Sequence, residues 1–383
     1  MTIDWSRVVS IEDLRQLARR HVPHPLFGFI DGGAEDEVAL SDNRAAFDRW
    51  KFHQRVFVDV SRIDTEVDLF GTPIRFPLAI SPTGLAGLAW PRAEVALARA
   101  AAAYGIPFTL ATPSTSSLER VAREAGGRLW FQLYVLRDRD YTMRLVERAR
   151  AADYEALVIT GDVAVAGKRE RDPRSGFTVP LRPRVANMIG LLGHPKWLWQ
   201  IATHGVPKIE NLADWSLANV GTQTLAAMAA SQFDSALDWE ALQRLRETWP
   251  RKLLLKGVLT AEDTEKAVAL GADGVIVSNH GGRQLDCTVA PLDALPEVVR
   301  AAGDKLAVLI DGGVRRGSHA MKARALGATA AMVGRATLYG VAAAGEEGAR
   351  HALEILTTEI KRSMALLGRI AVRDLDAGIM QRD

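Results

Sequence analysis

The stretch "VIVSNHGGRQLD", residues 275–286, decides the fold of this chain. Its opening residues are continuously apolar, which is typical of a strand buried on both faces, as in a parallel sheet. A serine, a histidine, two glycines and an arginine follow almost at once. An apolar strand therefore ends where chemically reactive side chains begin, and the rest of the chain can be compared with this pattern.

The same pattern recurs along the chain. Short apolar runs, each closed by glycine, proline or polar residues and followed by a helical pattern, cover residues 76–82, 106–112, 128–134, 155–162, 252–257, 274–280, 306–313 and 330–335. Eight such units predict an α/β fold, a closed (β/α)8 barrel of the TIM type. The alternative is an open, doubly wound sheet, but "GLAGLA" after the first run matches its phosphate fingerprint only weakly.

The chain is predicted to form a single barrel domain over residues 1–383, with two additions. "SIED", residues 10–13, is a capping box that opens an N-terminal helical segment. The interval 163–251 is longer than one crossover helix needs, so residues 175–231 are interpreted as an insertion after the fourth strand. Because Trp197 and Trp199 lie beside Lys196 there, the insertion could be a lid, an oligomer contact or a membrane-surface segment.

Composition excludes several classes of protein. The chain has 383 residues, of which 48% are apolar and 25% charged, and its net charge is +2. These values exclude a disordered chain and argue against a nucleic-acid partner. One cysteine cannot form an internal disulfide, no apolar run approaches about 18 residues, and the N-terminus has no signal-peptide pattern. We therefore expect a cytoplasmic protein, and no histidine shows the spacing of a metal ligand.

In a barrel of this kind, the active site lies where the strands end and the following loops begin. We therefore group the polar residues and glycines at these positions as one set, expected to converge on one mouth: Pro82, Thr83, Gly84, Thr112, Gln132, Tyr134, Thr160, Asp162, Lys256, Ser278, His280, Arg283, Asp311, Gly313, Arg315, Gly334 and Arg335.

The last two strands end in a pattern suited to phosphate. "DGGVRRG" and "VGRATL" each offer glycine backbone N–H groups and an arginine. The loops after strands seven and eight are the usual phosphate site of these barrels. The two motifs together predict a phosphate-binding cradle.

Three side chains suggest the chemistry. Histidine is the usual general base near neutral pH, so His280 suits this role, for which Asp162 is the natural orienting carboxylate. Arg283, three residues further on, is predicted to be free for a bidentate pair with a substrate carboxylate. Lys256 ends an apolar strand, where it would either form a Schiff base or hold a fixed positive charge beside a cofactor.

Five segments carry a family resemblance: "SNHGGRQLD", "IDGGVRRG", "LKGVLTAEDTEKAV", "WFQLYV" and "GGAEDEVALSDNRAAFDRWKF". With them, the chain resembles the FMN-dependent L-2-hydroxy acid oxidase and dehydrogenase family over about residues 8–370. "PTGL", "GDVAVAGKRERD" and "GRATLYG" look closest to its bacterial mandelate dehydrogenase branch. The insertion looks more like that of membrane-associated bacterial lactate dehydrogenases.

The resemblance implies a cofactor, FMN, and a role for each site residue. His280, paired to Asp162, would take the substrate's proton, Arg283 and Arg169 would bind its carboxylate, and Tyr134 would stabilise its hydroxyl or carboxylate. The cofactor contacts would be Pro82, Thr83, Gly84, Thr112, Gln132, Thr160, Lys256, Ser278, Asp311, Gly313, Arg315, Gly334 and Arg335.

The resemblance also implies a reaction: oxidation of a mandelate-like or lactate-like L-2-hydroxy acid to the 2-oxo acid. Electrons would pass to a quinone or other carrier, with oxygen as the alternative acceptor. A homotetramer is expected, with peripheral attachment to the inner face of the cell membrane through the insertion.

Two residues depart from the family pattern. Phe29 stands where a tyrosine usually binds the substrate carboxylate, and Ala111 stands where a serine usually contacts the flavin. A hydrogen bond to a charged group contributes about 1.5–3 kcal/mol, so an atypical substrate is one alternative. Two further alternatives are a flavin-free lyase or isomerase with a Schiff base at Lys256, and a non-catalytic flavin- or membrane-binding protein.

Overall fold

The computed structural model describes residues 3–178, 190–213 and 232–382. Eight parallel strands close into a barrel in the order β10-β11-β4-β5-β6-β7-β8-β9. The predicted (β/α)8 barrel is thus confirmed, and each predicted run corresponds to one barrel strand. The strands are β4 (Leu78–Ile80), β5 (Phe108–Ala111), β6 (Leu129–Leu133), β7 (Ala156–Thr160), β8 (Lys252–Val258), β9 (Gly274–Val277), β10 (Ala307–Ile310) and β11 (Ala330–Val333).

Burial explains why these strands show no alternation of polar and apolar residues. Every residue of β5, β6, β7, β9 and β11 is buried, because one face packs inside the barrel and the other against the surrounding helices. Seven of the eight strands end before their predicted run does, at the point where polar residues or glycines begin, whereas β8 extends one residue beyond its run, to Val258. Gln132, Thr160 and Lys256 therefore stand near the carboxyl ends of β6, β7 and β8, whereas His280, Arg283 and Asp311 stand on the loops that follow β9 and β10.

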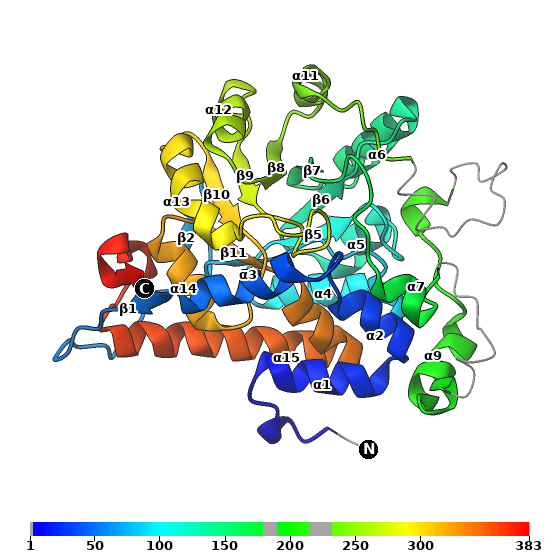
Figure 1. Cartoon of the computed structure of the whole chain (residues 1–383), viewed down its shortest axis with the longest axis horizontal. Helices are drawn as coiled ribbons and strands as arrows, with labels where there is room; N and C mark the ends of the chain where they lie inside the picture. Colours follow the sequence, from blue (N-terminus) through cyan, green and yellow to red (C-terminus); the bar gives the residue numbers. More distant parts are fainter. Residues whose placement is uncertain (1–2, 179–189, 214–231, 383) are drawn as a thin grey trace.

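Helices surround the barrel (Figure 1). The helices that follow the strands are α4 (Ala93–Ala103), α5 (Leu118–Ala125), α6 (Arg139–Ala151), α11 (Trp239–Thr248), α12 (Ala261–Ala269), α13 (Pro291–Ala302), α14 (Gly317–Ala325) and α15 (Arg335–Leu367). Helix α15 is broken at Ala344 and Gly345, whose dihedral angles are not helical.

The N-terminal segment is helical, as predicted, and leads to the barrel mouth. Helix α1 (Ile11–His21) begins at Ser10, whose side chain accepts a hydrogen bond from the N–H of Asp13. It lies along α15 (Figure 1). Helices α2 (His24–Asp31) and α3 (Val38–Asp48) follow. Outside the barrel, β1 (Trp50–Phe52) pairs with β12 (Met380–Arg382), and β2 (Val67–Leu69) forms a hairpin with β3 (Thr72–Ile74).

Two buried residues in the described parts of the interval between β7 and β8 help to attach it to the barrel mouth. They contain α7 (Arg171–Ser175), α9 (Pro195–His204) and a short 3-10 helix, η3 (Glu210–Leu212); the remainder of the predicted insertion, 179–189 and 214–231, lies outside the described residues. The indole N–H of buried Trp197 in α9 donates to the carbonyl of Leu88, at 2.8 Å. This bond attaches α9 to the loop after β4.

The second attachment is Asn211, a buried residue of η3. Its side-chain amide donates to Oγ of Ser114 at 2.8 Å and accepts the N–H of Leu118 at 2.9 Å. Ser114 belongs to the loop between β5 and α5, and Leu118 is the first residue of α5. The insertion is therefore held against the same end of the barrel as the loops that carry the predicted site.

Candidate active site

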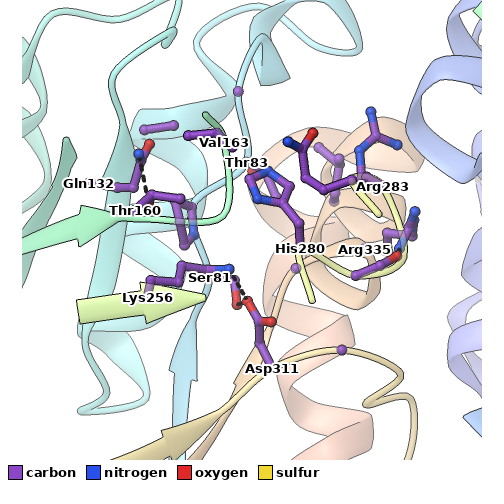
Figure 2. A pocket seen from close by; sticks show the side chains of 18 of the residues that line it. Ser81, Thr83, Gln132, Thr160, Val163, Lys256, His280, Arg283, Asp311 and Arg335 are labelled. Atoms are coloured by element: carbon purple, nitrogen blue, oxygen red, sulfur yellow. Dashed lines mark hydrogen bonds and ion pairs between the residues drawn. The ribbon is translucent and has the colours of Figure 1, made fainter. Parts of the chain in front are cut away.

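The predicted site residues converge on one cavity at the carboxyl ends of the strands. Figure 2 shows Gln132, Thr160 and Lys256 on one side of it and His280 and Arg283 on the other. The predicted residues that line this cavity are Phe29, Pro82, Thr83, Gly84, Gln132, Tyr134, Thr160, Arg169, Lys256, His280, Arg283, Asp311, Gly313, Arg315, Gly334 and Arg335. Asp162, Thr112 and Ser278 lie behind this lining and contact it.

His280 and Asp162 form a pair at the cavity wall. Nδ1 of His280 lies 2.9 Å from Oδ1 of Asp162, and Nε2 lies 3.3 Å from the hydroxyl of Tyr134. Burial by itself would raise the pKa of Asp162, but the charge and hydrogen bond of His280 and the charge of Lys256 together lower it. Asp162 is therefore ionised, and it orients the imidazole so that Nε2 faces the cavity.

A bulge in β8 makes room for this carboxylate. The pairing of β8 with β9 shifts register between Lys256 and Val258, and Gly257 there has a φ of +101°. A Cβ atom at Gly257 would lie 2.8 Å from Cβ of Asp162. Only glycine tolerates both the positive φ and the close approach.

The arginines form a positive cluster beside Phe29. Nη1 of Arg283 donates to the carbonyls of Phe29 and Gly32, both at 2.8 Å. Burial, together with the charges of Arg169 and Arg335, holds the pKa of Arg283 well below its usual range. Nε of Arg169 is buried without a hydrogen-bond partner among the described residues. An anion bound here would relieve the repulsion and supply the missing acceptor.

Arg283 has one edge of its guanidinium left for the predicted bidentate pair with a carboxylate. The two backbone bonds occupy Nη1, so only Nε and Nη2 are left for a ligand. The cause is the N-terminal segment: α2 ends at Asp31, and the carbonyls of Phe29 and Gly32 face the cavity rim.

Lys256 is buried in a network of its own. Its ammonium group lies 2.6 Å from Oγ of Ser278 and 3.0 Å from Oδ2 of Asp311, and its side chain is 4% exposed. Oγ of Ser278 donates to Asp311 at 2.5 Å, and Oγ of Ser81 does so at 3.2 Å. The salt bridge favours a charged lysine, whereas a Schiff base needs a neutral amine. The geometry thus supports a fixed positive charge at the cavity.

Gln132 and Thr160 present their polar atoms to the cavity from adjacent strands. Nε2 of Gln132 donates to Oγ1 of Thr160 at 2.9 Å (Figure 2). Thr112 was predicted as a cofactor contact, but it is buried behind Gln132 and donates to that residue's carbonyl at 2.6 Å. Its hydroxyl accepts the N–H of Tyr134 at 3.0 Å. Thr112 therefore supports the end of β6 and does not line the cavity.

The predicted phosphate cradle combines a glycine turn with a helix N-terminus. Gly312 and Gly313 have φ angles of +97° and +81°, and a Cβ at Gly313 would lie 2.0 Å from the carbonyl oxygen of Asn43. Helix α15 begins directly after Gly334, so its first N–H groups face the same end of the cavity. Such an N-terminus suits a phosphate group.

Arg335 also contacts the backbone of two segments at the cavity mouth. Its guanidinium donates to the carbonyls of Ile30 at 3.0 Å, Gly281 at 2.9 Å and Gly32 at 2.6 Å. These three bonds connect the turn that carries His280 to the end of α2 in the N-terminal segment. Nη1 of Arg315, by contrast, donates to the carbonyl of Val314 in its own loop, at 2.8 Å.

Sequence reasoning missed the apolar wall of the cavity. Phe233 and Ile209 line it, and Phe233 packs on Tyr134 with 4.6 Å between ring centroids. Phe177 stacks on Phe29, with 4.5 Å between centroids and 17° between planes. These residues come from the long β7–β8 interval and not from strand ends, so no strand-end pattern pointed to them. Ser81 also lines the cavity. It was missed because it directly follows the apolar residues of β4, with no glycine or other polar residue to mark the position.

The fold and this site define the class of protein: a (β/α)8-barrel enzyme with a histidine–aspartate pair, a buried lysine and a cluster of arginines at one mouth. The chain belongs to the FMN-dependent dehydrogenase family, whose model matches residues 18–382. The family resemblance drawn from the sequence is thereby confirmed, and FMN is the cofactor.

Individual relatives agree over nearly the whole chain. (S)-Mandelate dehydrogenase from Pseudomonas putida is 43% identical over 374 residues, 98% of this chain and 94% of that protein. L-Lactate oxidase from Nostoc sp. (strain PCC 7120) is 40% identical over 380 residues, 98% of each. A crystal structure described as the monotopic membrane protein (S)-mandelate dehydrogenase matches with a TM-score of 0.93 and 43% identity, over 98% of this chain and all of that one. The protein is thus an FMN-dependent 2-hydroxy acid dehydrogenase or oxidase.

The residues at the mouth fit FMN. The cradle of Gly312, Gly313 and the N-terminus of α15 suits its phosphate. The buried charge of Lys256 and the polar atoms of Gln132 and Thr160 suit a ring that carries carbonyl oxygens and gains negative charge on reduction.

Proposed function

We propose that the protein oxidises an L-2-hydroxy acid with an aromatic or lactate-like side chain to the 2-oxo acid. One observation carries the proposal: the paired His280 and the cluster of Arg169 and Arg283 open into the same cavity as the buried Lys256. A base, a carboxylate-binding group and a fixed positive charge beside the cofactor position are what this oxidation needs.

Each side chain has a defined task in this reaction. Arg283, through Nε and Nη2, and Arg169 bind the substrate carboxylate, which supplies the negative charge the cluster lacks. The Tyr134 hydroxyl, 3.3 Å from Nε2 of His280, orients the substrate hydroxyl beside the base. His280 takes one proton from the substrate, and ionised Asp162 stabilises the resulting imidazolium. FMN, when bound, would take up the two electrons of the oxidation together with the second hydrogen of the substrate.

The cavity wall supports an apolar substrate side chain. Phe29, Val163, Ile209 and Phe233 line it near the arginines. Burial of an aromatic or aliphatic group against them is favourable, whereas a second carboxylate would have to be desolvated there. Mandelate-like acids fit this wall, and lactate-like acids leave part of it uncovered.

We propose a quinone-type acceptor and peripheral contact with a membrane surface. Leu192 lies just before α9 and is 75% exposed, and Trp199 lies within α9 and is 71% exposed. Tryptophan is favoured at the interface between lipid and water. The mandelate dehydrogenase relative is described as monotopic. No helix in the described part of this chain is long and apolar enough to cross a membrane. A membrane-surface position would bring the mouth close to lipid-soluble carriers.

The reaction is tested by anaerobic titration of the purified yellow protein. L-Mandelate, L-lactate, glycolate and a long-chain 2-hydroxy acid are added separately, with D-mandelate as the matched control, while the flavin absorbance is recorded. We expect L-mandelate or L-lactate to bleach the flavin and D-mandelate to leave it oxidised. A flavin that stays oxidised with all four of these acids overturns the proposal.

The acceptor is tested with the reduced protein from the same titration. A water-soluble ubiquinone analogue should reoxidise the flavin at least tenfold faster than dissolved oxygen does. The opposite order would make the protein an oxidase and overturn only the choice of acceptor.

Two further predictions rest on the family resemblance: a homotetramer and attachment on the inner face of the membrane. Light scattering of the purified protein tests the first, with an expected mass of four 41.7 kDa chains. Protease protection in inverted and right-side-out membrane vesicles tests the second.

A further inference from the structure

The side chain of Gln284 is fully engaged with one neighbouring loop. This residue follows Arg283 in the His280 turn and is 9% exposed. Its Nε2 donates to the carbonyls of Asp162 and Val165, both at 2.9 Å, and its Oε1 accepts the N–H of Gly167 at 3.1 Å. Both amide protons are used, so the side chain has no donor left for a ligand, although it borders the cavity.

The same loop approaches the His280 turn too closely for a side chain. A Cβ at Gly167 would lie 2.3 Å from the carbonyl oxygen of Arg283 and 2.7 Å from Cα of Gln284. The backbones are therefore in direct contact at this point. Three hydrogen bonds and this contact join loop 162–169 to the turn.

The two joined segments carry the groups that must cooperate. Loop 162–169 has Asp162 at one end and Arg169 at the other, whereas the turn carries His280 and Arg283. The 2.9 Å contact between Asp162 and His280 depends on the relative position of the two segments. Because Gln284 bonds to the backbone carbonyl of Asp162, a shift of its amide would move the backbone that carries the Asp162 carboxylate.

We propose that Gln284 is a positioning residue that sets Asp162 against His280 and Arg169 beside Arg283. The proposal rests on the proposed function for its kinetic consequence, but not for its structural one. Gln284 acts through Asp162 and the loop, and it does not contact the substrate.

The first test uses Gln284→Met, which keeps the length of the side chain and removes its hydrogen bonds, in the FMN-loaded protein. Gly167→Ala disturbs the same junction from the other side. Gly161→Ala is the matched control, because a Cβ at Gly161 meets only the carbonyl oxygen of Lys256, at 3.8 Å. Amide hydrogen exchange is followed in peptides that cover residues 160–172. We expect at least tenfold faster exchange in the first two variants and no change in the control.

The second test is a double-mutant cycle on the rate of flavin reduction by L-mandelate. We expect Gln284→Met to lower this rate at least tenfold in the otherwise unchanged chain and less than twofold in an Asp162→Asn background. Flavin content and absorbance should stay unchanged. A residue that only stabilised the fold would lower the rate by the same factor in both backgrounds.

The outcomes separate this proposal from the proposed function. Equal rate losses in both backgrounds, or unchanged exchange in both junction variants, would overturn the role of Gln284. If no hydroxy acid bleaches the flavin of the unchanged protein, the proposed function fails, and hydrogen exchange alone still decides whether Gln284 holds loop 162–169. If Gln284→Met does not fold, Gly167→Ala decides by the same exchange and rate measurements.

Discussion

His280 has a left-handed backbone conformation, with a φ of +59°, which is uncommon for a residue other than glycine. Neighbouring side chains maintain it. Asn279 exchanges two amide hydrogen bonds with Asn43, at 2.8 and 2.7 Å, and the N–H of His280 donates to Oγ of Ser278 at 3.0 Å. Strain of this kind persists where the surroundings determine it, and it is frequent at functional sites.

The orienting role of Asp162 predicts a large kinetic effect. Asp162→Asn keeps the size of the side chain but removes the charge that stabilises the imidazolium of His280. Flavin reduction by L-mandelate should slow by about 100-fold or more, while FMN content stays the same. Stopped-flow absorbance measures the rate, and a variant within threefold of the unchanged protein would contradict the proposed pairing.

Phe29 predicts an effect on substrate affinity. Its ring lies 5.1 Å from the guanidinium carbon of Arg283 and 5.9 Å from that of Arg169. Phe29→Tyr adds a hydroxyl donor near the bound carboxylate, and a bond to a charged group contributes about 1.5–3 kcal/mol. We expect KM for L-mandelate to fall at least tenfold with little change in kcat.

The control for this variant is Phe29→Leu, which removes the aromatic ring and its contact with both cations. Steady-state kinetics on the same acid should show a raised KM. A tyrosine variant with an unchanged KM would mean that the substrate carboxylate lies away from position 29.

Among the elements, Asp31 joins the helices that frame the mouth. It ends α2, accepts hydrogen bonds from Arg15 in α1 at 2.6 and 2.8 Å, and accepts one from Tyr339 in α15 at 2.7 Å. Burial alone would raise the pKa of Asp31, but the bonds from Arg15 and Tyr339 lower it from 3.8 to about 2. The ionised carboxylate is therefore stabilised in the folded state.

This shift predicts a pH dependence of stability. Because the folded pKa is depressed, the contribution of Asp31 is fully present above its ordinary value and is lost as the pH falls towards 2. A shift of this size corresponds to about 2 kcal/mol at neutral pH. Asp31→Asn should lower the free energy of unfolding by about that amount at pH 7, and the difference should narrow between pH 4 and pH 2.

Urea unfolding over this pH range measures the effect. Asp153→Asn is the control, because Asp153 is exposed and its ion pair with Arg251 lies at the surface, where such pairs contribute little. A difference between Asp31→Asn and the unchanged protein that stays constant down to pH 2 would contradict the assigned pKa.

At the scale of the whole molecule, α9 and the residues beside it form an exposed apolar region at one side, beyond α2 and α7 (Figure 1). Trp199→Glu and Leu192→Glu should each weaken binding to anionic lipid vesicles by about tenfold or more, because one buried apolar side chain contributes about 1.5–3 kcal/mol. Vesicle sedimentation measures the binding.

The matched control is Leu366→Glu, at the far end of α15, where the leucine is 68% exposed. Its binding to vesicles should stay unchanged, as should flavin bleaching by L-mandelate in all three variants. Equal loss of vesicle binding in the Leu366 variant would mean that charge alone, and not α9, governs the association.

The sequence by itself determined the barrel and most of the cavity lining. Parallel strands are buried on both faces, so they appear as continuous apolar runs, and in a closed barrel their carboxyl ends meet at one mouth. Lys256 in β8 could therefore be placed beside His280 and Arg283, which follow β9. The family resemblance added FMN, which no spacing of residues could name.

Only the tertiary structure decided which backbones and loops meet at that mouth. Arg335 bonds to carbonyls of the N-terminal segment, and Phe233 and Ile209 reach the cavity from the long interval between β7 and β8. The sequence also left Gln284 without a role, although it stands inside the deciding stretch. Contacts of this kind depend on the path of a loop, and a loop's path is set by the surface on which it packs rather than by a local pattern of its residues.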